Sequence, residues 1–578
     1  MSVRILGLVL VFAAAKLAAQ TPASTTTPSP TPSRTTAGTS TPGTGADTSA
    51  TGTARIRTTT AGPQVDPAGV VGTRLLGGGG RLPPRVYERF LELAGGKDRA
   101  RIVLIPTASE TVDDPAGLQK ALARWQQDHP GFHFELLHTR DRQRADDEAF
   151  CAPLRQATAV WLGGGAQKNL ADAYLGTRVE RELQALLARG GVVGGTSAGT
   201  AIQTRTMIQE GKENPIVATG FDFVPFAVSD QHFLKRSRLG RLVRVLGEHP
   251  GHFGLGVDEG TAVLLQGRTL EVLGDSKAVL VLPAVAGRPQ QVLELAEGNR
   301  QDLVAWQRAA RARAAAPWPP TPMAAPTLPN GTLLLAGGGP LPNGLVDRFV
   351  ELAGGANAKI VVIGGATEPG SDDREPFADL LRQRGLPTVA TLALRHPRDV
   401  DEAALATLRD ATGLWFGGGR QWRFVDTYEG TPAVAAFHAV LARGGVIAGS
   451  SAGATIQGEF LVRGDPLGNT VMHCEGYERG FGFLPGCAID QHFVARDRER
   501  DLVQLVGELP QLIGLGIDEG AALEVHGSLA TVLGERTVAV FDARRPQQDR
   551  PTRHWLSPGD SWDLVAGERA AKPPASGR

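Results

Sequence analysis

Three motifs that carry a serine, a histidine and an acidic residue occur twice, in the same order, in this chain of 578 residues. A serine hydroxyl becomes a useful nucleophile when a histidine removes its proton and an acid orients that histidine. The doubled set therefore predicts hydrolysis through a covalent intermediate. The first set is Gly-Gly-Thr-Ser-Ala-Gly around Ser197, Asp-Gln-His-Phe around His232 and Gly-Leu-Gly-Val-Asp-Glu ending at Glu259; the second is Gly-Ser-Ser-Ala-Gly around Ser451, Asp-Gln-His-Phe around His492 and Gly-Leu-Gly-Ile-Asp-Glu ending at Glu519.

The acid of each set has a rival at the preceding position. Asp258 precedes Glu259, and Asp518 precedes Glu519. Either acid type can orient an imidazole and stabilise its cation. The motif alone therefore leaves both residues of each pair as candidates.

The serines are expected in sharp turns between a strand and a helix. In the first copy the apolar pair Val192-Val193 precedes Ser197, and a helical pattern begins at Ala198. Such a turn lets the serine side chain project clear of the sheet, and the first amide of the helix can donate to an oxyanion. Ala198 and its counterpart Ala452 are therefore candidate oxyanion donors.

A second glycine-rich turn follows an apolar run in each copy. The turns read Gly-Gly-Gly-Ala-Gln from Gly163 and Gly-Gly-Gly-Arg-Gln from Gly417. Glycine lets backbone N–H groups approach a substrate closely. The turns supply further candidate oxyanion donors and two glutamines that could hold polar substrate groups: Gly164, Gly165, Gly418 and Gly419, with Gln167 and Gln421.

The spacing of the motifs indicates that whole domains are duplicated. Gly163 and Ser197 lie 34 positions apart, as do Gly417 and Ser451, and each histidine precedes its glutamate by 27 positions. The serine and the histidine are 35 positions apart in the first copy and 41 in the second, which predicts a surface loop about six residues longer. A period this long favours two domains over a solenoid.

Short apolar runs alternate with amphipathic stretches within each copy. This alternation predicts an α/β fold of two tandem doubly wound domains, each with a mostly parallel sheet covered on both faces. Ligands of such sheets bind at the carboxyl ends of the strands. We expect strands at 73–76, 101–105, 133–137, 159–162 and 191–194, helices at 86–93, 118–127 and 179–188, and, in the second copy, strands at 359–363, 413–416 and 445–448.

The N-terminal part of the chain differs from the rest. Arg4 precedes an apolar run and several small residues, a pattern typical of a secretory signal peptide and too short for a membrane span. We expect residues 1–20 to be this signal, followed by a disordered Thr/Ser/Pro-rich linker at 21–68. The predicted domains are 69–316 and 330–570, joined by a Pro-rich linker at 317–329, and the predicted location is secreted or periplasmic, in the cell envelope.

Charge and composition exclude some other classes of function. Sixty basic residues balance sixty acidic residues, so the chain lacks a general nucleic-acid footprint. The spacings of Cys and His do not resemble a metal site. We therefore expect no nucleic-acid partner, no metal and no cofactor.

Together these motifs resemble the cyanophycinase branch of the serine peptidase family that also contains aspartyl dipeptidase. The resemblance rests on the serine motif, on Asp-Gln-His-Phe-x-x-Arg-x-Arg-x-x-Arg-Leu from Asp230 to Leu242, and on Gly-x-Asp-Glu-x-Thr-Ala from Gly256 to Ala262. It extends over most of residues 70–285 and 330–545. It implies a fold like that of class I glutamine amidotransferases, which is flavodoxin-like, with a Ser-His-Glu triad and therefore with Glu259 as the acid.

The resemblance also implies a substrate. In this family it is cyanophycin, a poly-aspartate backbone with arginine on each β-carboxyl, which is cleaved to β-aspartyl-arginine dipeptides. Arginines can hold carboxylates by paired hydrogen bonds, and an aspartate can receive a guanidinium. The implied substrate-binding residues of the first copy are Gln167, Asp230, Gln231, Arg236, Arg238 and Arg241.

The second copy keeps the motifs but departs from this set. Asp501 stands at the position of Arg241, and Ala521 stands at the position of Thr261. Exchanging a cation for an anion reverses the charge that a site prefers. The second site is therefore expected either to act on another substrate or only to bind one, through the matching residues Gln421, Asp490, Gln491, Arg496 and Arg498.

Three functions are compatible with these features. The leading hypothesis is a secreted cyanophycinase-like serine exopeptidase that acts on a peptide polymer. The alternatives are an aspartyl or isoaspartyl peptidase of the same family that acts on short peptides, and a non-catalytic binding scaffold. If relatives pair as homodimers, the two domains of this chain are expected to form an intramolecular pseudo-dimer.

Overall fold

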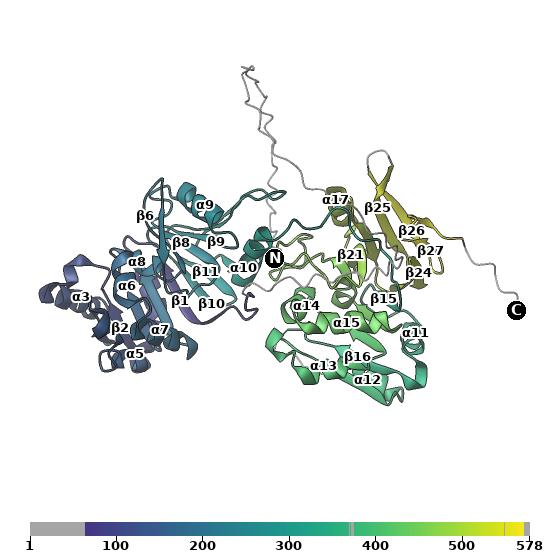
Figure 1. Ribbon diagram of the computed structural model, residues 1–578, viewed down its shortest axis with the longest axis horizontal. Helices are drawn as coiled ribbons and strands as arrows, with labels where there is room; N and C mark the ends of the chain where they lie inside the picture. The colour runs from purple at the N-terminus through teal and green to yellow at the C-terminus, as the bar shows by residue number, and fades with distance from the viewer. Residues whose placement is uncertain (1–63, 369, 371–374, 548–549, 572–578) are drawn as a thin grey trace, which may run out of the picture. The chain divides into compact units, whose positions relative to one another are not determined.

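Two similar α/β repeats make up the part of the chain that the computed structural model describes, residues 64–368, 370, 375–547 and 550–571 (Figure 1). Both repeats belong to one compact unit. The expected signal peptide at 1–20 and nearly all of the expected linker at 21–68 lie outside the described residues. No helix within the described ranges combines the length and the apolar character that a membrane crossing requires.

An eight-stranded sheet is the centre of the first repeat, in the order β14-β11-β10-β1-β5-β4-β2-β3. The run β1-β5-β4-β2-β3 is parallel, and β10, β11 and β14 add to it in antiparallel fashion. The strands are β1 (Val70–Gly77), β2 (Arg101–Ile105), β3 (His133–Leu136), β4 (Ala159–Leu162), β5 (Val192–Thr196), β10 (Thr261–Gly267), β11 (Thr269–Gly274) and β14 (Arg300–Asp302).

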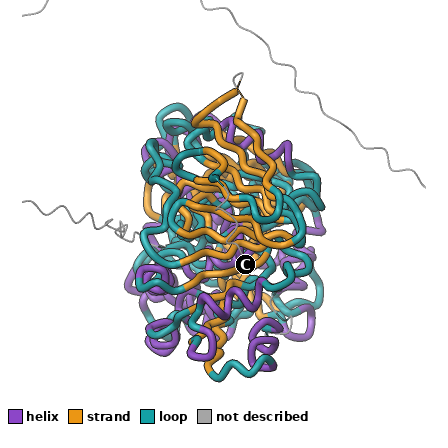
Figure 2. Tube along the Cα trace, turned by 90° about the vertical axis from the view of Figure 1, so that its right-hand side faces the viewer, coloured by secondary structure: helices purple, strands orange, loops and turns teal. Residues whose placement is uncertain are grey.

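Helices cover both faces of this sheet because successive strand residues point to opposite sides. Ile102 and Leu104 of β2 pack in the cluster that includes α1, whereas Val103 and Ile105 pack with α6 and α7. Figure 2 faces the second repeat, where the strands, in orange, likewise occupy the middle and helices, in purple, lie toward the outside. The helices are α1 (Pro84–Leu93), α2 (Gly96–Arg99), α3 (Pro115–Asp128), α4 (Arg142–Asp146), α5 (Ala152–Gln156), α6 (Gln167–Tyr174), α7 (Arg178–Ala188), α8 (Ala198–Ala201), α9 (Leu239–Glu248) and α10 (Leu303–Ala314).

A second, smaller sheet of four strands carries two of the three catalytic motifs. Its order is β13-β12-β9-β8, and only the pair β8 and β9 is parallel. The His232 motif follows β8 and the Glu259 motif follows β9, while Ser197 follows β5 of the large sheet. The strands are β8 (Ala227–Gln231), β9 (Phe253–Val257), β12 (Ala278–Leu282) and β13 (Gln291–Leu295), with a separate hairpin of β6 (Thr206–Glu210) and β7 (Ile216–Thr219).

The second repeat has the same plan, with sheets of nine and five strands. The larger sheet contains β15 (Thr332–Ala336), β16 (Lys359–Ile363), β17 (Thr388–Leu392), β18 (Gly413–Phe416), β19 (Val446–Ser450), β23 (Ala521–His526), β24 (Leu529–Gly534), β27 (Ser561–Asp563) and β28 (Glu568–Arg569). The smaller contains β20 (Gly458–Phe460), β21 (Leu484–Gln491), β22 (Ile513–Ile517), β25 (Val538–Gln547) and β26 (Arg550–Leu556). Its helices are α11 (Leu345–Leu352), α12 (Pro376–Gln383), α13 (Glu402–Arg409), α14 (Gln421–Tyr428), α15 (Pro432–Ala442), α16 (Ala452–Thr455) and α17 (Glu499–Glu508).

The predicted α/β fold class is confirmed. The strands predicted at 101–105, 159–162, 359–363 and 413–416 match β2, β4, β16 and β18 at both ends. The parallel part that was expected comprises five strands of the first large sheet. The antiparallel strands that extend it, and the separate small sheet, were not predicted.

Candidate active sites

Ser197 lies in the sharp turn between β5 and α8, and its backbone is in a rarely occupied conformation. Its φ is 52° and its ψ is −110°. Ser451 has nearly the same values, φ 56° and ψ −115°, between β19 and α16. A non-glycine residue at positive φ is strained, and such residues persist where the surrounding structure fixes them. Both turns therefore hold a serine side chain in one outward orientation.

The histidine and the glutamate of each repeat meet their serine in one hydrogen-bonded chain. In the first repeat, 2.9 Å separates Ser197 Oγ from His232 Nε2, and 2.7 Å separates His232 Nδ1 from Glu259 Oε1. The corresponding distances in the second repeat are 2.9 Å and 2.6 Å, in the set Ser451, His492 and Glu519. With the imidazole Nδ1–H donating to the carboxylate, Nε2 is free to accept the serine proton. Both repeats thus have the geometry of a Ser-His-Glu triad.

Hydrogen bonds distinguish the two candidate acids of each pair. Asp258 does not face the imidazole: its Oδ1 accepts a hydrogen bond from the Lys235 N–H at 2.8 Å and its Oδ2 accepts one from Ser276 Oγ at 2.8 Å. Asp518 likewise accepts from backbone N–H groups of the loop after His492. The aspartates therefore hold the loop that follows the histidine, and the glutamates orient the histidine.

A glycine run at the end of β1 holds the serine and the histidine of the triad in place. This role of the run was not predicted. The Ser197 N–H donates to Gly77 O at 2.9 Å, and the His232 N–H donates to Gly78 O at 2.7 Å. Gly79 has φ +100°, and a Cβ there would lie 2.2 Å from His232 Cε1. The repetition of this run at 77–80 and 337–339 was visible in the sequence, but its contacts require two strands that are distant in sequence.

Most of the expected oxyanion donors lie beside the serine. Ala198 is the first residue of α8, so its N–H belongs to the group of helix amides that have no partner within the helix. Gly164 is also close, since a Cβ built on it would be 3.6 Å from Ser197 Cβ. Gly418 has the same relation to Ser451, at 3.9 Å. The structure thus brings Ala198 and Gly164 to the first serine, and Gly418 to the second, where Ala452 opens α16. A Cβ built on Gly165 or Gly419 would instead meet Ala108 or Ala366.

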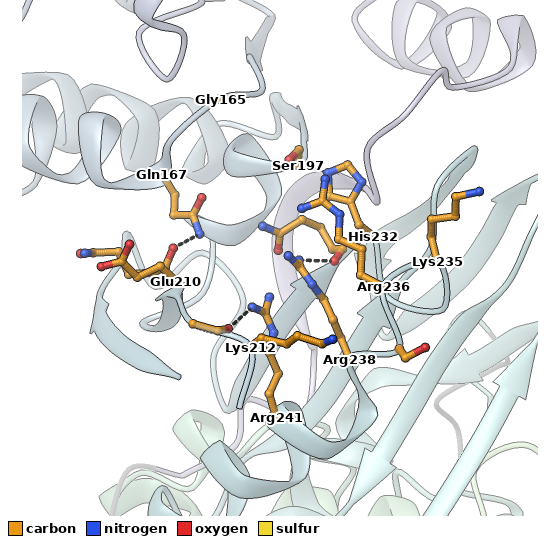
Figure 3. A pocket seen from close by; sticks show the side chains of 14 residues that line it. Gly165, Gln167, Ser197, Glu210, Lys212, His232, Lys235, Arg236, Arg238 and Arg241 are labelled. Atoms are coloured by element: carbon orange, nitrogen blue, oxygen red, sulfur yellow. Dashed lines mark hydrogen bonds between the residues drawn. The ribbon is translucent and has the colours of Figure 1, made fainter. Parts of the chain in front are cut away.

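A cavity of about 890 Å³ adjoins the first triad (Figure 3). Gln167 and Glu210 lie on one side of it, and Arg236 and Arg238 lie on the other. Lys212, Lys235 and Arg236 are exposed, so the cations at the mouth outnumber its acid. The lining residues are Gly165, Gln167, Ser197, Gln209, Glu210, Gly211, Lys212, Gln231, His232, Lys235, Arg236, Ser237, Arg238 and Arg241.

Two of the predicted substrate-binding arginines are paired with the predicted substrate-binding aspartate. Asp230 has no exposed surface, and Arg241 binds it with Nε and Nη2 while Arg238 Nη1 lies 3.2 Å from its Oδ1. The Asp230 carboxylate therefore lies behind the arginines, outside the cavity lining, rather than receiving a substrate guanidinium as expected. Arg236 is the member of the arginine set that is exposed at the mouth.

Gln167 and Gln231 differ in whether their side-chain amides remain available to a ligand. Gln167 Nε2 donates to the carbonyl oxygens of Ile208 and Gln209, at 2.8 and 2.5 Å, so its amide fastens β6 to the site. Gln231 lines the cavity, and its Oε1 is buried with no hydrogen-bond partner among the described residues. A buried acceptor without a partner costs free energy unless a ligand or water supplies a donor. Gln231 is therefore the better candidate for direct substrate contact.

The buried cluster around Asp230 gives a stability prediction. Replacing Asp230 with alanine leaves two guanidinium groups without their partner, and breaking a buried pair in this way costs about 3–5 kcal/mol. We expect a clearly lower midpoint of urea and thermal denaturation. Asp275→Ala is the control, because it removes an exposed partner of Arg85 and is expected to change the midpoint little. Equal midpoints for both variants would contradict a structural role of the cluster.

Burial and three charged groups, Glu259, Arg236 and Arg238, act on the pKa of the first histidine. Burial of the imidazole, the largest effect, lowers the pKa of His232 below its ordinary value of 6.5. The Glu259 carboxylate opposes this shift of the pKa, and the Arg236 guanidinium adds to it. Burial likewise lowers the pKa of His492. Both imidazoles are therefore held in the neutral form that can accept a proton at neutral pH.

The chemical groups gathered at each site indicate the kind of reaction that it can perform. Within the described ranges, no group of three His, Cys, Asp or Glu side chains is placed to hold a metal ion. The groups that the structure gathers at each site are a nucleophile, a base, an acid and backbone donors. These are the parts used in acyl transfer.

Comparison with known proteins gives two matches to one family model along the chain. The model is described as Peptidase family S51, and it matches residues 75–273 and 333–533. A cyanophycinase of Synechococcus elongatus is 33% identical over 208 residues, which are 34% of this chain and 63% of that protein. The chain thus spans less than two thirds of the length of this relative. A cyanophycinase of Geminocystis herdmanii is 31% identical over 205 residues, 34% of this chain and 74% of that protein.

A relative with another name and a solved structure also match. A probable alpha-aspartyl dipeptidase of Drosophila melanogaster is 31% identical over 195 residues, 31% of this chain and 75% of that protein. The crystal structure of a peptidase from an acI-B1 Actinobacterium is 23% identical with a TM-score of 0.34, and the match covers 41% of this chain and 98% of that one.

Proposed function

Because the chain belongs to peptidase family S51, we propose that it hydrolyses amide bonds of aspartyl peptides through a serine nucleophile. The observation that carries this proposal is the chain of hydrogen bonds from Ser197 through His232 to Glu259, built on a strained turn between strand and helix. The same chain of hydrogen bonds exists in the second repeat. Intact geometry in both repeats argues against a non-catalytic scaffold.

The reaction at the first site follows from the positions of these groups. Ser197 Oγ attacks the carbonyl carbon while its proton passes to His232 Nε2, and Glu259 stabilises the imidazolium that forms. The Ala198 N–H and the N–H groups of the Gly164 turn donate to the oxyanion. His232 then gives the proton to the leaving amine. Water, deprotonated by the same histidine, attacks the acyl-serine carbonyl. The bond to Ser197 Oγ then breaks, His232 returns the proton to Oγ, and the acid product leaves.

For the first site we propose cyanophycin as the substrate, with release of β-aspartyl-arginine dipeptides. The exposed cations Lys212, Lys235 and Arg236 surround a cavity large enough for part of a polymer, and they complement carboxylates. Two relatives named cyanophycinase, 33% identical over 208 residues and 31% identical over 205 residues, support the same substrate class. Gln231 Oε1 is placed to accept an N–H of the substrate.

A second candidate function is an aspartyl or isoaspartyl peptidase that acts on short peptides. The relative that supports it is the alpha-aspartyl dipeptidase, which the chain matches over three quarters of its length. Both candidates use the same chemistry and differ in the length of the peptide that reaches the serine.

The test compares substrates with the full chain. Purified protein is incubated with cyanophycin and with α- and β-aspartyl dipeptides, and products are identified by mass spectrometry. We expect β-aspartyl-arginine from cyanophycin, and no product from the double variant Ser197→Ala/Ser451→Ala. Product from dipeptides alone would favour the second candidate. Product from none of them would exclude both.

The pH dependence of the first site provides a further prediction. A base with a lowered pKa stays neutral as pH falls, so kcat/KM in a Ser451→Ala background is expected to decline only below pH 6.5. Arg236→Gln removes a cation that depresses the pKa of His232, so the decline is expected to move to higher pH. About 1 M salt should reduce this difference by screening. An identical pH profile with and without Arg236 would contradict the assigned coupling.

We also propose that the two repeats act as an internal pair and that the chain is exported. Ion pairs join the repeats: Arg313 Nε lies 2.7 Å from Glu475 Oε2, and Arg288 Nη1 lies 2.7 Å from Glu478 Oε1. These contacts support a pseudo-dimer.

The apolar run after Arg4 supports export, which N-terminal sequencing of the protein recovered outside the cytoplasm would test.

A further inference from the structure

Each site has its own Ser-His-Glu triad, but the arginine that pairs with the buried aspartate comes from a different element in each repeat. In the first repeat Arg241 of α9 binds Asp230 with two nitrogens. In the second repeat the corresponding helix position is Asp501, and Arg463 binds Asp490 instead, with Nε and Nη2 each 2.9 Å from a carboxylate oxygen. The arginine that pairs with the buried aspartate thus lies on the helix in the first repeat and in the segment after β20 in the second.

Arg463 occupies the place of a cavity-lining residue. Gln167 donates to the carbonyl oxygens of Ile208 and Gln209, and Gln421 donates to those of Val462 and Arg463. Arg463 is therefore the counterpart of Gln209, which lines the first cavity. The Arg463 side chain is 2% exposed, so it fills interior space on this side of the second site.

Other groups of the second site are engaged by the protein itself. Arg420, the counterpart of Ala166, donates to the carbonyl oxygens of Asp465 and Gly468 and so fastens the loop after Arg463 to the glycine turn. Arg498 Nη1 donates to Gln491 Oε1 at 3.1 Å, whereas the matching oxygen of Gln231 has no partner among the described residues. The second site therefore leaves less room and fewer free polar groups than the first.

The segment after the second histidine also lacks the positive excess of the first: Arg496 and Arg498 match Arg236 and Arg238, but several other positions lose a cation or gain an acid. Ala495, Asp497 and Asp501 stand where the first repeat has Lys235, Ser237 and Arg241. The Asp501 side chain is 43% exposed, and it shares the Arg463 guanidinium with the buried Asp490. Arg498 also contacts Asp490, so two guanidinium groups face two carboxylates here, whereas in the first repeat Arg238 and Arg241 face Asp230 alone. Asp501 is the acid of the two that solvent reaches. A cationic group of a ligand can therefore bind there.

We propose that the second site hydrolyses short aspartyl peptides that carry a cationic group, an ammonium or a guanidinium, which Asp501 receives. This inference rests on the proposed function, because it assumes that the second triad is hydrolytic. It assigns the sites to consecutive steps: the first takes a carboxylate-rich polymer, and the second consumes short, guanidinium-bearing peptides of the class that the first releases. The products of the second step are then free amino acids.

The first part of the test isolates the second site with Ser197→Ala in the full chain. The substrates are β-aspartyl dipeptides that differ only in the second residue, arginine, leucine or glutamate, together with cyanophycin. We expect kcat/KM to be at least about tenfold higher for the arginine peptide than for the glutamate peptide, since like charges at a site repel. Cyanophycin is expected to be a poor substrate. An N-acetylated arginine peptide distinguishes ammonium from guanidinium recognition.

The second part exchanges the charge arrangement. Arg463→Gln with Asp501→Arg recreates the pattern of the first repeat and keeps a guanidinium for Asp490, which protects the fold. In the Ser197→Ala background this double variant is expected to lose the preference for the arginine peptide. Glu508→Arg is the control for the helix, because it makes the same exchange of an acid for arginine as Asp501→Arg at the other end of α17, and it should leave the preference unchanged. Circular dichroism and thermal denaturation check that each variant is folded.

Three outcomes would overturn the inference. The first is the same order of substrates for Ser197→Ala and Ser451→Ala. The second is a folded exchange variant that retains the preference for arginine. The third is hydrolysis by Ser451→Ala but none by Ser197→Ala, which leaves the proposed function of the first site standing. If the wild-type chain cleaves no substrate, the proposed function itself fails, and the inference fails with it.

Discussion

Ser197→Ala is expected to lower the rate of dipeptide release from cyanophycin by about 10⁴-fold or more. Alanine removes the atom that forms the acyl bond, and the remaining backbone donors can only assist attack by water. The turn itself should persist, because the Ser197 N–H to Gly77 O bond involves no side chain. Measuring kcat from the initial rate of dipeptide formation gives the loss directly.

Ser451→Ala is the matched control for this prediction. Its turn has the same geometry and its serine makes the same 2.9 Å contact with histidine, so the two variants change the same atoms in two places. We expect release from the polymer to continue in Ser451→Ala at nearly the wild-type rate. If Ser197→Ala kept the wild-type rate and Ser451→Ala lost it, the two sites would have been assigned in the wrong order.

Glu259→Gln is expected to lower kcat by about 10²–10⁴-fold with a smaller change in KM. Glutamine keeps the shape of the side chain, but it is neutral and can offer an amide N–H to His232 Nδ1. The imidazole then loses both the stabilisation of its cation and the tautomer that leaves Nε2 able to accept a proton. The loss should therefore fall on the chemical step rather than on binding.

Asp258→Asn separates this effect from a general disturbance of the loop. Lys235 N–H and Ser276 Oγ contact different oxygens of Asp258. Asn keeps an oxygen that can accept from the Lys235 N–H, and its amide group can donate to the Ser276 hydroxyl oxygen. We expect kcat within about tenfold of the wild type, since no group on the imidazole changes. A loss in Asp258→Asn as large as that in Glu259→Gln would argue that the carboxylates act together in placing the loop.

The parts of the fold with local sequence signals could be predicted well. Strands such as β2 and β4 are short apolar runs bounded by charge and glycine, and the sequence marks them at both ends. The strands β10, β11 and β14 carry no such simple signal of where they pair. The place of β10 beside β1 depends on pairs such as Thr73 with Gln266, almost 200 positions apart, which local pattern does not encode. The strands β11 and β14 then extend the sheet outward from β10.

The triad residues could be predicted because the reaction requires those residue types. The roles of the arginines could not, because each role depends on which carboxylate the side chain contacts. One serine, one histidine and one glutamate recur in the same order within matching motifs, so they stand out. Arg236, Arg238 and Arg241 look alike in sequence, yet one is exposed and two are paired with Asp230. The shift of an arginine from α9 to position 463 was invisible for the same reason, because no motif shows which carboxylate a guanidinium will meet.

The positive φ at both serines has a consequence for how the duplicated chain has changed. A residue held in this conformation costs about 1–3 kcal/mol, and glycine would remove most of that cost. In a repeat with no reaction to perform, Ser451→Gly would thus be a gain in stability without a loss. The second repeat nevertheless pairs a strained serine with an ordered base and acid, a cost in stability that the proposed hydrolysis at this site would explain.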